Sequence, residues 1–210
     1  MKMPLKKIPA LWIQFLLFTI VMLSVYPVTA DDEVALGRVQ APVTIIEYGS
    51  LTCDYCIYFH REVLPHIQSR YIDTGQVRFI YRNFPTSNAA IRGAVAARCA
   101  GDQYYKMLDV LFAQVGTWAG ADDVDKALIK KAAALNINEE DFQACLNDPS
   151  QDQAIVAVQL QAKKEFDIRG TPTFVVNGKV VRGKQTIEKM DALIKEAQLE
   201  FPLATAGKTQ

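Results

Sequence analysis

The sequence predicts an α/β fold in which helices flank one mixed central sheet and an all-helical subdomain is inserted into that fold. Residues 41–84 contain two β-branched runs separated by a helical pattern, and residues 170–197 contain two more runs followed by a helical pattern. The stretch between them has helical periodicity throughout. Neither strand-bearing part can cover both faces of its strands alone, so we expect both to share one sheet.

The first strand-bearing part has the order strand, helix, strand. Residues 41–50, "APVTIIEYGS", form a β-branched run that indicates a buried strand. Apolar residues from 53 to 71 then recur every three or four positions, which is the period of a helix with one buried face. Pro65 lies inside that pattern, and we expect it to kink the helix rather than end it. Residues 76–84, "QVRFIYRNF", predict the second strand.

The helical block and the C-terminal part carry clear boundary signals. Asp122 or Asp123 can cap one helix, Asn138 can cap another, and Pro149 suits the first turn of a third. The dipeptide Asn177-Gly178 between two β-branched runs predicts a hairpin, because both turn residues need a positive φ.

A helix with Thr186 as its N-cap then closes the domain, and we expect a loose tail after Phe201.

The N-terminal segment is typical of a secretory signal. Three lysines precede an apolar run over residues 11–25, and the small residues 28–30 suit cleavage. The alternative is an uncleaved anchor, since residues 11–28 are just long enough to cross a bilayer. Cleavage removes those three lysines and no acid from a chain with 23 basic and 23 acidic residues, which leaves a formal charge of −3. No Lys and Arg cluster stands out, so nucleic-acid binding has no electrostatic basis.

We therefore predict a cleaved signal peptide (1–30), a first part with the C-x-x-C motif (31–86), a helical insertion (87–166), a second part (167–201) and a loose tail (202–210).

Four cysteines form a close pair, Cys53 and Cys56 in "LTCDYCIYFH", and a distant pair, Cys99 and Cys145. A structural zinc site needs four ligands, and the chain offers one C-x-x-C and two histidines, so we expect no metal and no other cofactor. A purely structural disulfide across so short a loop would restrain little of the unfolded chain.

The position of the close pair favours redox exchange instead. Cys53 falls where a strand and loop meet the start of a helix, and unpaired N–H groups and the helix dipole stabilise a thiolate there. A lowered pKa makes Cys53 the attacking or leaving sulfur, while the more buried Cys56 resolves the mixed disulfide. We therefore predict a redox-active Cys53–Cys56 disulfide.

Residues 41–197 resemble the thioredoxin superfamily, and specifically the DsbA-type thiol:disulfide oxidoreductases of bacterial envelopes. The resemblance rests on the C-x-x-C at a helix start, the internal proline, the helical insertion and "IRGTPTFVVNG" near the C-terminus. It implies a thioredoxin fold, a periplasmic location and an oxidase whose substrates are reduced exported proteins. It also implies a quinone-linked membrane protein as the reoxidising partner.

Three further site residues follow from the resemblance. Thr171-Pro172 matches the family's cis-proline dipeptide, which would lie beside the Cys53 sulfur and leave the Thr171 backbone free to pair with an extended substrate. Glu47, six residues before Cys53, matches a buried acid that relays the proton of Cys56.

The surroundings of Glu47 allow more than one interpretation. A solvent-facing carboxylate on a strand edge is the alternative to a buried acid, and Arg78 or Arg82 is a candidate partner for a buried one. We expect His60 and His66 on the helix surface with no catalytic part, because neither lies beside the first cysteine on the helix.

The dipeptide between the sulfurs departs from the family pattern. DsbA-like oxidases often carry Pro-His there, whereas this chain carries Asp54-Tyr55. A nearby carboxylate disfavours a second anion, so we expect Cys53 to be less acidic than in the strongest oxidases. The expected reduction potential lies between about −120 mV and about −270 mV.

In an oxidising compartment, Cys99 and Cys145 are expected to form a structural disulfide, with two inert buried thiols as the alternative. A disulfide isomerase or reductase of the same fold is the rival function, and a non-catalytic chaperone or adhesin is a third. Isomerases of this superfamily usually carry an N-terminal dimerisation module, and residues 31–39 are too short for one. We therefore expect a monomeric oxidase.

Overall fold

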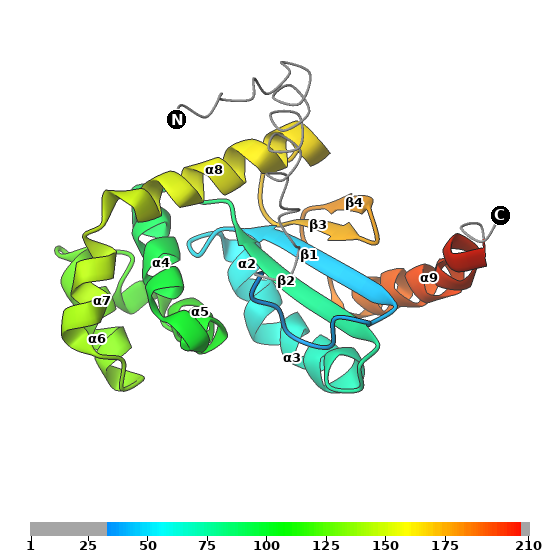
Figure 1. Ribbon diagram of the computed structural model, residues 1–210, viewed down its shortest axis with the longest axis horizontal. Coiled ribbons are helices and arrows are strands. Elements are labelled where there is room, and N and C mark those ends of the chain that lie inside the picture. The colour runs from blue at the N-terminus through cyan, green and yellow to red at the C-terminus, as the bar shows by residue number, and fades with distance from the viewer. Residues whose placement is uncertain (1–32, 207–210) are drawn as a thin grey trace, which may run out of the picture. The chain divides into compact units, whose positions relative to one another are not determined.

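The computed structural model describes residues 33–206, so the predicted signal peptide and residues 207–210 lie outside the described part (Figure 1). Its four-stranded sheet has the order β2 (Val77–Asn83), β1 (Val43–Gly49), β3 (Thr173–Val176) and β4 (Lys179–Arg182). β1 pairs parallel with β2, whereas β1 with β3 and β3 with β4 pair antiparallel. The two strand-bearing parts of the sequence therefore share one mixed sheet, as predicted.

The central strand β1 points an acid into the core. Side chains alternate along a strand, so Val43, Ile45 and Glu47 share one face, and all three are fully buried. In the sheet register, Glu47 lies between Tyr81 of β2 and Phe174 of β3. The solvent-facing alternative for Glu47 is therefore excluded.

The predicted first helix is present, but it alternates between α and π turns. α2 (Asp54–Tyr58) and α3 (Leu64–Ile67) are α-helical, whereas η1 (Phe59–Val63) and η2 (Gln68–Ile72) are π-helical. Pro65 lies in the first turn of α3, where the absence of its N–H is best tolerated. The helix therefore continues past Pro65 and does not end there.

The predicted insertion consists of α4 (Asn88–Cys99), α5 (Tyr104–Ala113), α6 (Val124–Ala134), α7 (Glu139–Leu146) and α8 (Pro149–Phe166). Asp123 accepts a hydrogen bond from the N–H of Lys126 at 2.9 Å and is the N-cap of α6. Asn138 caps α7 in the same way, through the N–H of Asp141 at 3.0 Å. The predicted helix starts are therefore confirmed, with Asp123 as the cap of the two candidates.

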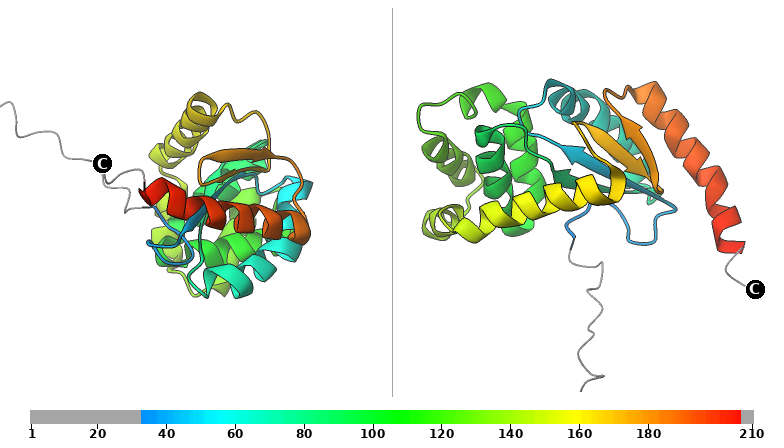
Figure 2. Two further views of the ribbon diagram at one scale, coloured as in Figure 1. Left: turned by 90° about the vertical axis from the view of Figure 1, so that its right-hand side faces the viewer. Right: turned by 90° about the horizontal axis from the view of Figure 1, so that it is seen from above.

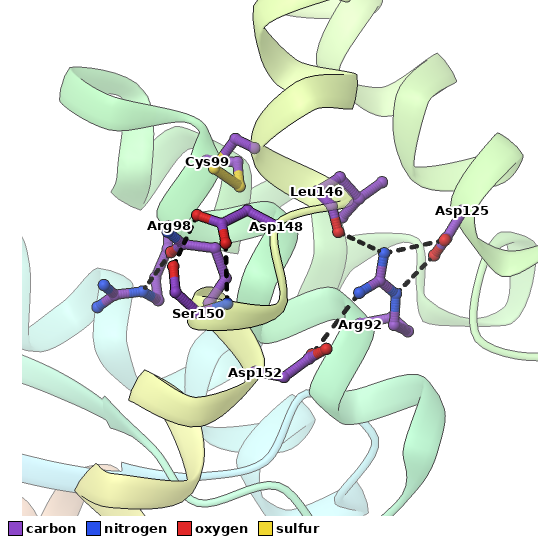
Figure 3. Close-up of polar contacts among 10 residues, drawn as sticks. Arg92, Arg98, Cys99, Asp125, Leu146, Asp148, Ser150 and Asp152 are labelled. Carbon is purple, nitrogen blue, oxygen red and sulfur yellow. Dashed lines mark hydrogen bonds and ion pairs between the residues drawn. A yellow bond between two sulfur atoms is a disulfide. The ribbon is translucent and has the colours of Figure 1, made fainter.

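Arg92 ties α4 to three neighbouring segments of the insertion (Figure 3). Its guanidinium donates two hydrogen bonds to the Asp125 carboxylate, of 2.8 and 2.9 Å, and one to the Leu146 carbonyl at 2.8 Å. A carboxylate oxygen of Asp152, at the start of α8, lies 3.6 Å away. One side chain on α4 therefore holds α6, the end of α7 and α8 together.

The predicted structural disulfide is also present. Cys99 at the end of α4 is bonded to Cys145 in α7, with the two Cα atoms 5.7 Å apart. The alternative of two inert thiols is therefore excluded.

Helices cover both faces of the sheet. Phe79 of the sheet packs in a cluster with side chains of the first helix, of α5 and of α9 (Ile187–Ala206), among them Met190. On the other face, Val175 packs in a smaller cluster with Ala162 of α8. Figures 1 and 2 show α8 on one side of the sheet and the first helix and α9 on the other. Within residues 33–206, none of the helices combines the length and apolar character that a bilayer crossing needs.

The C-terminal part confirms the hairpin and corrects the tail. Asn177 and Gly178 have φ values of 44° and 90° between β3 and β4, as the turn requires. α9 (Ile187–Ala206) runs through Pro202, so residues 202–206 of the predicted tail are helical. A proline has a φ that suits a helix and removes one backbone hydrogen bond, so the helix passes through it.

Candidate active site

Cys53 lies at the junction between the first strand and the first helix. It is the N-cap of α2, and its carbonyl accepts a hydrogen bond from the N–H of Ile57 at 2.9 Å. Its side chain is a free, partly exposed thiol. The start of α2 therefore presents this sulfur to solvent.

Hydrogen bonds to the sulfur lower the pKa of Cys53 to about 5. The largest contribution comes from the side chain of Cys56, and Thr171 and the backbone N–H groups of Cys56 and Tyr55 add to it, while partial burial opposes them. These N–H groups belong to the first helical turn, where they have no partner within the helix. At neutral pH, Cys53 is therefore a thiolate.

Cys56 has the opposite character. It is fully buried, and the N–H of Ser50 donates to its sulfur at 3.5 Å. Burial raises the pKa of Cys56 far above the value of a free thiol, and the hydrogen bond to Cys53 and the Glu47 carboxylate act in the same direction. The pair thus combines one accessible, anionic sulfur with one buried, neutral sulfur.

The Thr171–Pro172 segment lies beside the accessible sulfur. The peptide bond between the two residues is cis, and the Thr171 carbonyl oxygen lies 3.4 Å from Cys53 Sγ. The N–H of Gly183 donates to the Pro172 carbonyl at 2.9 Å and holds this loop against the end of β4. The structure therefore brings together two segments that are more than a hundred residues apart in the sequence.

Glu47 connects the sulfur pair to the core. It is fully buried, and its carboxylate acts electrostatically on the Cys56 thiol. Burial raises the pKa of Glu47 above its usual value, although the neighbouring His60 and Cys56 act against this. Nε2 of His60 lies 2.9 Å from Oε2 of Glu47, with side-chain exposures of 2% and 0%.

His60 is the site residue that the sequence prediction missed. We expected it on the helix surface, but it is buried, and its ring stacks on that of Phe112 in α5 with centroids 3.8 Å apart. It follows the buried Cys56 by four residues, so both side chains share one face of the helix. From that spacing, a buried position of His60 could have been predicted.

Other charged residues considered for the site lie elsewhere. Arg82 donates to the Tyr48 hydroxyl at 2.7 Å, and the partner of Glu47 is a histidine, so the prediction of Arg78 or Arg82 as that partner is wrong. His66 is 3.2 Å from Asp191 of α9. Over residues 33–206, His, Cys, Asp and Glu side chains form no group of three or more that could hold a metal ion.

The rim of the sulfur pair is aromatic and carries a positive charge. Tyr55, between the two cysteines, is 52% exposed. The Lys184 ammonium lies 4.0 Å from the ring centroid of Tyr58 and 5.9 Å from that of Tyr55, which are cation–π distances. This rim therefore combines two aromatic rings with one lysine.

Comparisons with known proteins agree with this geometry. The family model described as Thioredoxin matches residues 29–196. A putative protein-disulfide oxidoreductase of Rickettsia conorii is 28% identical over 80% of this chain, and the chain spans only 61% of that relative's length. The disulfide bond formation protein D of Bacillus subtilis is 29% identical, with 73% of this chain and 75% of the relative covered. The crystal structure of Wolbachia pipientis α-DsbA1 superimposes with a TM-score of 0.76 at 27% identity, covering 83% of this chain and 95% of that one.

Proposed function

Since the chain belongs to the thioredoxin family, we propose that it is a periplasmic thiol:disulfide oxidoreductase that introduces disulfide bonds into exported proteins through Cys53 and Cys56. The observation that carries the proposal is the opposite acidity of the two sulfurs, with the pKa of Cys53 lowered to about 5 and that of Cys56 raised. Dithiol exchange needs one sulfur that leaves as a thiolate and one that stays protonated.

The first half of the reaction consumes the Cys53–Cys56 disulfide. A substrate thiolate attacks Cys53 Sγ, the bond between the two cysteines breaks, and its electron pair leaves with Cys56. Because burial raises the pKa of Cys56, this sulfur takes up a proton. Glu47, whose pKa is also raised and which interacts electrostatically with Cys56, is the group that gives it.

The second half releases the product. Another substrate thiolate attacks the substrate's own sulfur in the mixed disulfide, and Cys53 leaves as the thiolate that its surroundings stabilise. Two substrate thiols have then become one disulfide, and the enzyme has gained two electrons. The disulfide of a reoxidising partner must accept them, and the family resemblance favours a quinone-linked membrane protein for this role.

Thr171 has a positioning role in this proposal. Its backbone lies next to Cys53, with the carbonyl oxygen 3.4 Å from the sulfur. An extended substrate segment that pairs with this backbone, as an added strand does, brings its cysteine to Cys53. The aromatic rim of Tyr55 and Tyr58 then contacts the neighbouring substrate residues.

Several observations support oxidation over isomerisation. A stabilised Cys53 thiolate favours the reduced pair and so makes the disulfide oxidising. The name of one relative, the disulfide bond formation protein D, also points to disulfide formation. The exposed Asp54 beside Cys53 disfavours the thiolate and so moderates the oxidising power of the disulfide. We therefore propose a reduction potential between about −120 mV and about −270 mV. We also propose that the protein is a monomer.

Refolding of a reduced protein with several disulfides tests the proposal. The oxidised enzyme alone, without glutathione, should form disulfides rapidly, whereas the Cys53→Ala variant should form none above background. A Cys99→Ala/Cys145→Ala variant is the control, because it also loses cysteine side chains but keeps the redox pair, and it should remain active. Rescue of scrambled disulfides in a glutathione buffer, without net oxidation, would favour the isomerase alternative. Equal rates for wild type and Cys53→Ala would exclude both functions.

A further inference from the structure

We propose that His60 carries protons between Glu47 and a pocket on the side of the first helix, so that the buried half of the redox pair exchanges protons with solvent there and not through the active-site mouth. The inference rests on the proposed function, because it concerns the proton that Cys56 takes up and releases in that cycle. His60 acts through Glu47 and is therefore a positioning and relay residue, not one that touches substrate.

His60 connects the buried acid to a cavity. Its Nε2 lies 2.9 Å from Oε2 of Glu47, and its side chain also lines a cavity of about 420 Å³ between the first helix and α5. Pro65 and Gln68 of the first helix and Asp109 of α5 line the same cavity, and all three are exposed. The cavity therefore opens to solvent, with His60 at its inner wall.

The charged and titratable groups around His60 are arranged along this route. On the inner side, Glu47 interacts electrostatically with Cys56, and burial raises the pKa of Tyr81 so far that its phenol keeps its proton. On the cavity side, the Asp109 carboxylate interacts electrostatically with His60, and partial burial raises the pKa of Asp109.

Two further charged side chains, Arg61 and Glu62, line the cavity from the helix that carries His60. On the inner side, the Cys53 thiolate raises the pKa of Glu47. Of the groups that touch Glu47, His60 is the one that also borders the cavity.

The two ring nitrogens of His60 have different surroundings. Nε2 faces Glu47, whereas Nδ1 is buried and has no hydrogen-bond partner within residues 33–206. During reoxidation, Cys56 loses its proton to Glu47 and attacks Cys53 Sγ in the mixed disulfide with the oxidant, and the oxidant's sulfur leaves with the electron pair. Glu47 then protonates Nε2, and the ring releases the Nδ1 proton toward the cavity that the His60 side chain lines. During substrate oxidation each proton moves the opposite way, so one full cycle restores the original tautomer.

Single-turnover oxidation of the reduced protein by glutathione disulfide tests the inference. Formation of the mixed disulfide on Cys53 depends on glutathione disulfide concentration, whereas its resolution by Cys56 does not, and acid quenching with mass spectrometry separates the two steps. The His60→Gln variant keeps a side chain that can hydrogen-bond Glu47 but accepts no proton. It should form the mixed disulfide at the wild-type rate and resolve it roughly tenfold more slowly, a smaller effect than loss of a direct general base.

A control variant and chemical rescue complete the experiment. His66→Gln changes the same residue type on the same helix, at a position that contacts Asp191, and it should leave both steps unchanged. Free imidazole should restore the resolution rate of His60→Ala in proportion to its concentration, because the cavity admits it next to Glu47. Should His60→Ala fail to fold, His60→Gln alone decides.

Three outcomes would overturn the inference: wild-type resolution in His60→Gln, equal slowing of both steps, or no rescue of folded His60→Ala by imidazole. Failure of the proposed function looks different, because wild type itself would then form no mixed disulfide on Cys53.

Discussion

At the scale of single residues, Cys53 and Cys56 show how position alone separates two identical side chains. Cys53 is the N-cap of α2 and meets N–H groups that have no partner in the helix, so the pKa of its thiol falls to about 5. Cys56 lies inside the core, where a charge would lose its hydration, so the pKa of its thiol rises. An exposed carboxylate at Asp54 does not reverse this difference.

The Glu47→Gln variant should be more stable than wild type in the reduced state, and this difference in the free energy of unfolding should grow as the pH rises. The folded-state pKa of Glu47 is raised above the ordinary value of 4.5. A group with a raised pKa contributes stability that is fully present below the unfolded pKa and is lost as the pH rises through the folded pKa. Glutamine is always neutral, so the difference in the free energy of unfolding should be small below pH 4.5 and grow toward neutral pH. Urea unfolding of both reduced proteins across this range measures it, and a difference independent of pH would contradict the raised pKa.

The residues of the site were predictable to different degrees. The cysteine pair follows from its place at a strand-to-helix junction, and the resemblance to a known family identified Glu47 and Thr171-Pro172. The partner of Glu47 was not found, because it depends on the packing of His60 against Phe112, which comes from a helix far along the sequence. A periodic pattern reports which face of a helix is buried, not which residue of another element lies against it.

At the scale of elements, the first helix shows a similar limit. Apolar residues at spacings of three and four predicted a helix through Pro65, and the helix is there. The same pattern is compatible with the π turns over Phe59–Val63 and Gln68–Ile72, which change the hydrogen-bond ladder but not the general periodicity. In η1, the N–H of Leu64 donates to the carbonyl of Phe59, five residues earlier, so this turn just before the proline contains one residue more than an α-helical turn.

Removal of the Cys99–Cys145 disulfide should lower stability and leave the exchange reaction intact. The two cysteines are 46 positions apart. Cross-linking a loop of this length restricts the unfolded chain by the equivalent of roughly 4 kcal/mol on the chain-entropy model. The Cys99→Ala/Cys145→Ala variant should lose about that much free energy of unfolding in urea. A variant as stable as the oxidised wild type would show that the bond contributes nothing.

Arg92→Ala should destabilise the insertion by about 1 to 2 kcal/mol, because Asp125 and the Leu146 carbonyl lose a shared donor. Arg169→Ala is the control, since its ion pair with Asp167 is largely solvent-exposed, at 79% and 63%, and pairs of this kind contribute little. Urea unfolding compares the two variants with wild type. Equal stability of the two variants would mean that Arg92 does not hold these segments together.

At the scale of the whole molecule, the sequence predicted that two distant strand-bearing parts share a sheet, because neither part has enough apolar surface to cover its strands alone. It did not specify that β1 separates β2 from β3, since strand neighbours depend on how the connecting helices cross the sheet. It also did not specify how far the last helix extends beyond the amphipathic stretch, because a proline such as Pro202 weakens a helix without forbidding it.

The thiolate couples the redox state of the site to the stability of the whole fold. Only the reduced protein has it, with a pKa of about 5 for Cys53 in the fold against an ordinary value of 9.0. A group with a depressed pKa contributes stability that is present above the unfolded pKa and is lost as the pH falls through the folded pKa. The melting temperature of the reduced protein minus that of the oxidised protein should therefore increase as the pH rises from about 5 toward 9.0. The pH dependence of melting of a Cys53→Ser variant under reducing conditions should follow that of the oxidised protein, because serine forms no thiolate. If the difference between the two redox states is flat across this range, Cys53 is no more acidic in the fold than a free thiol, and the thiolate stabilisation on which the proposed oxidising role rests is absent.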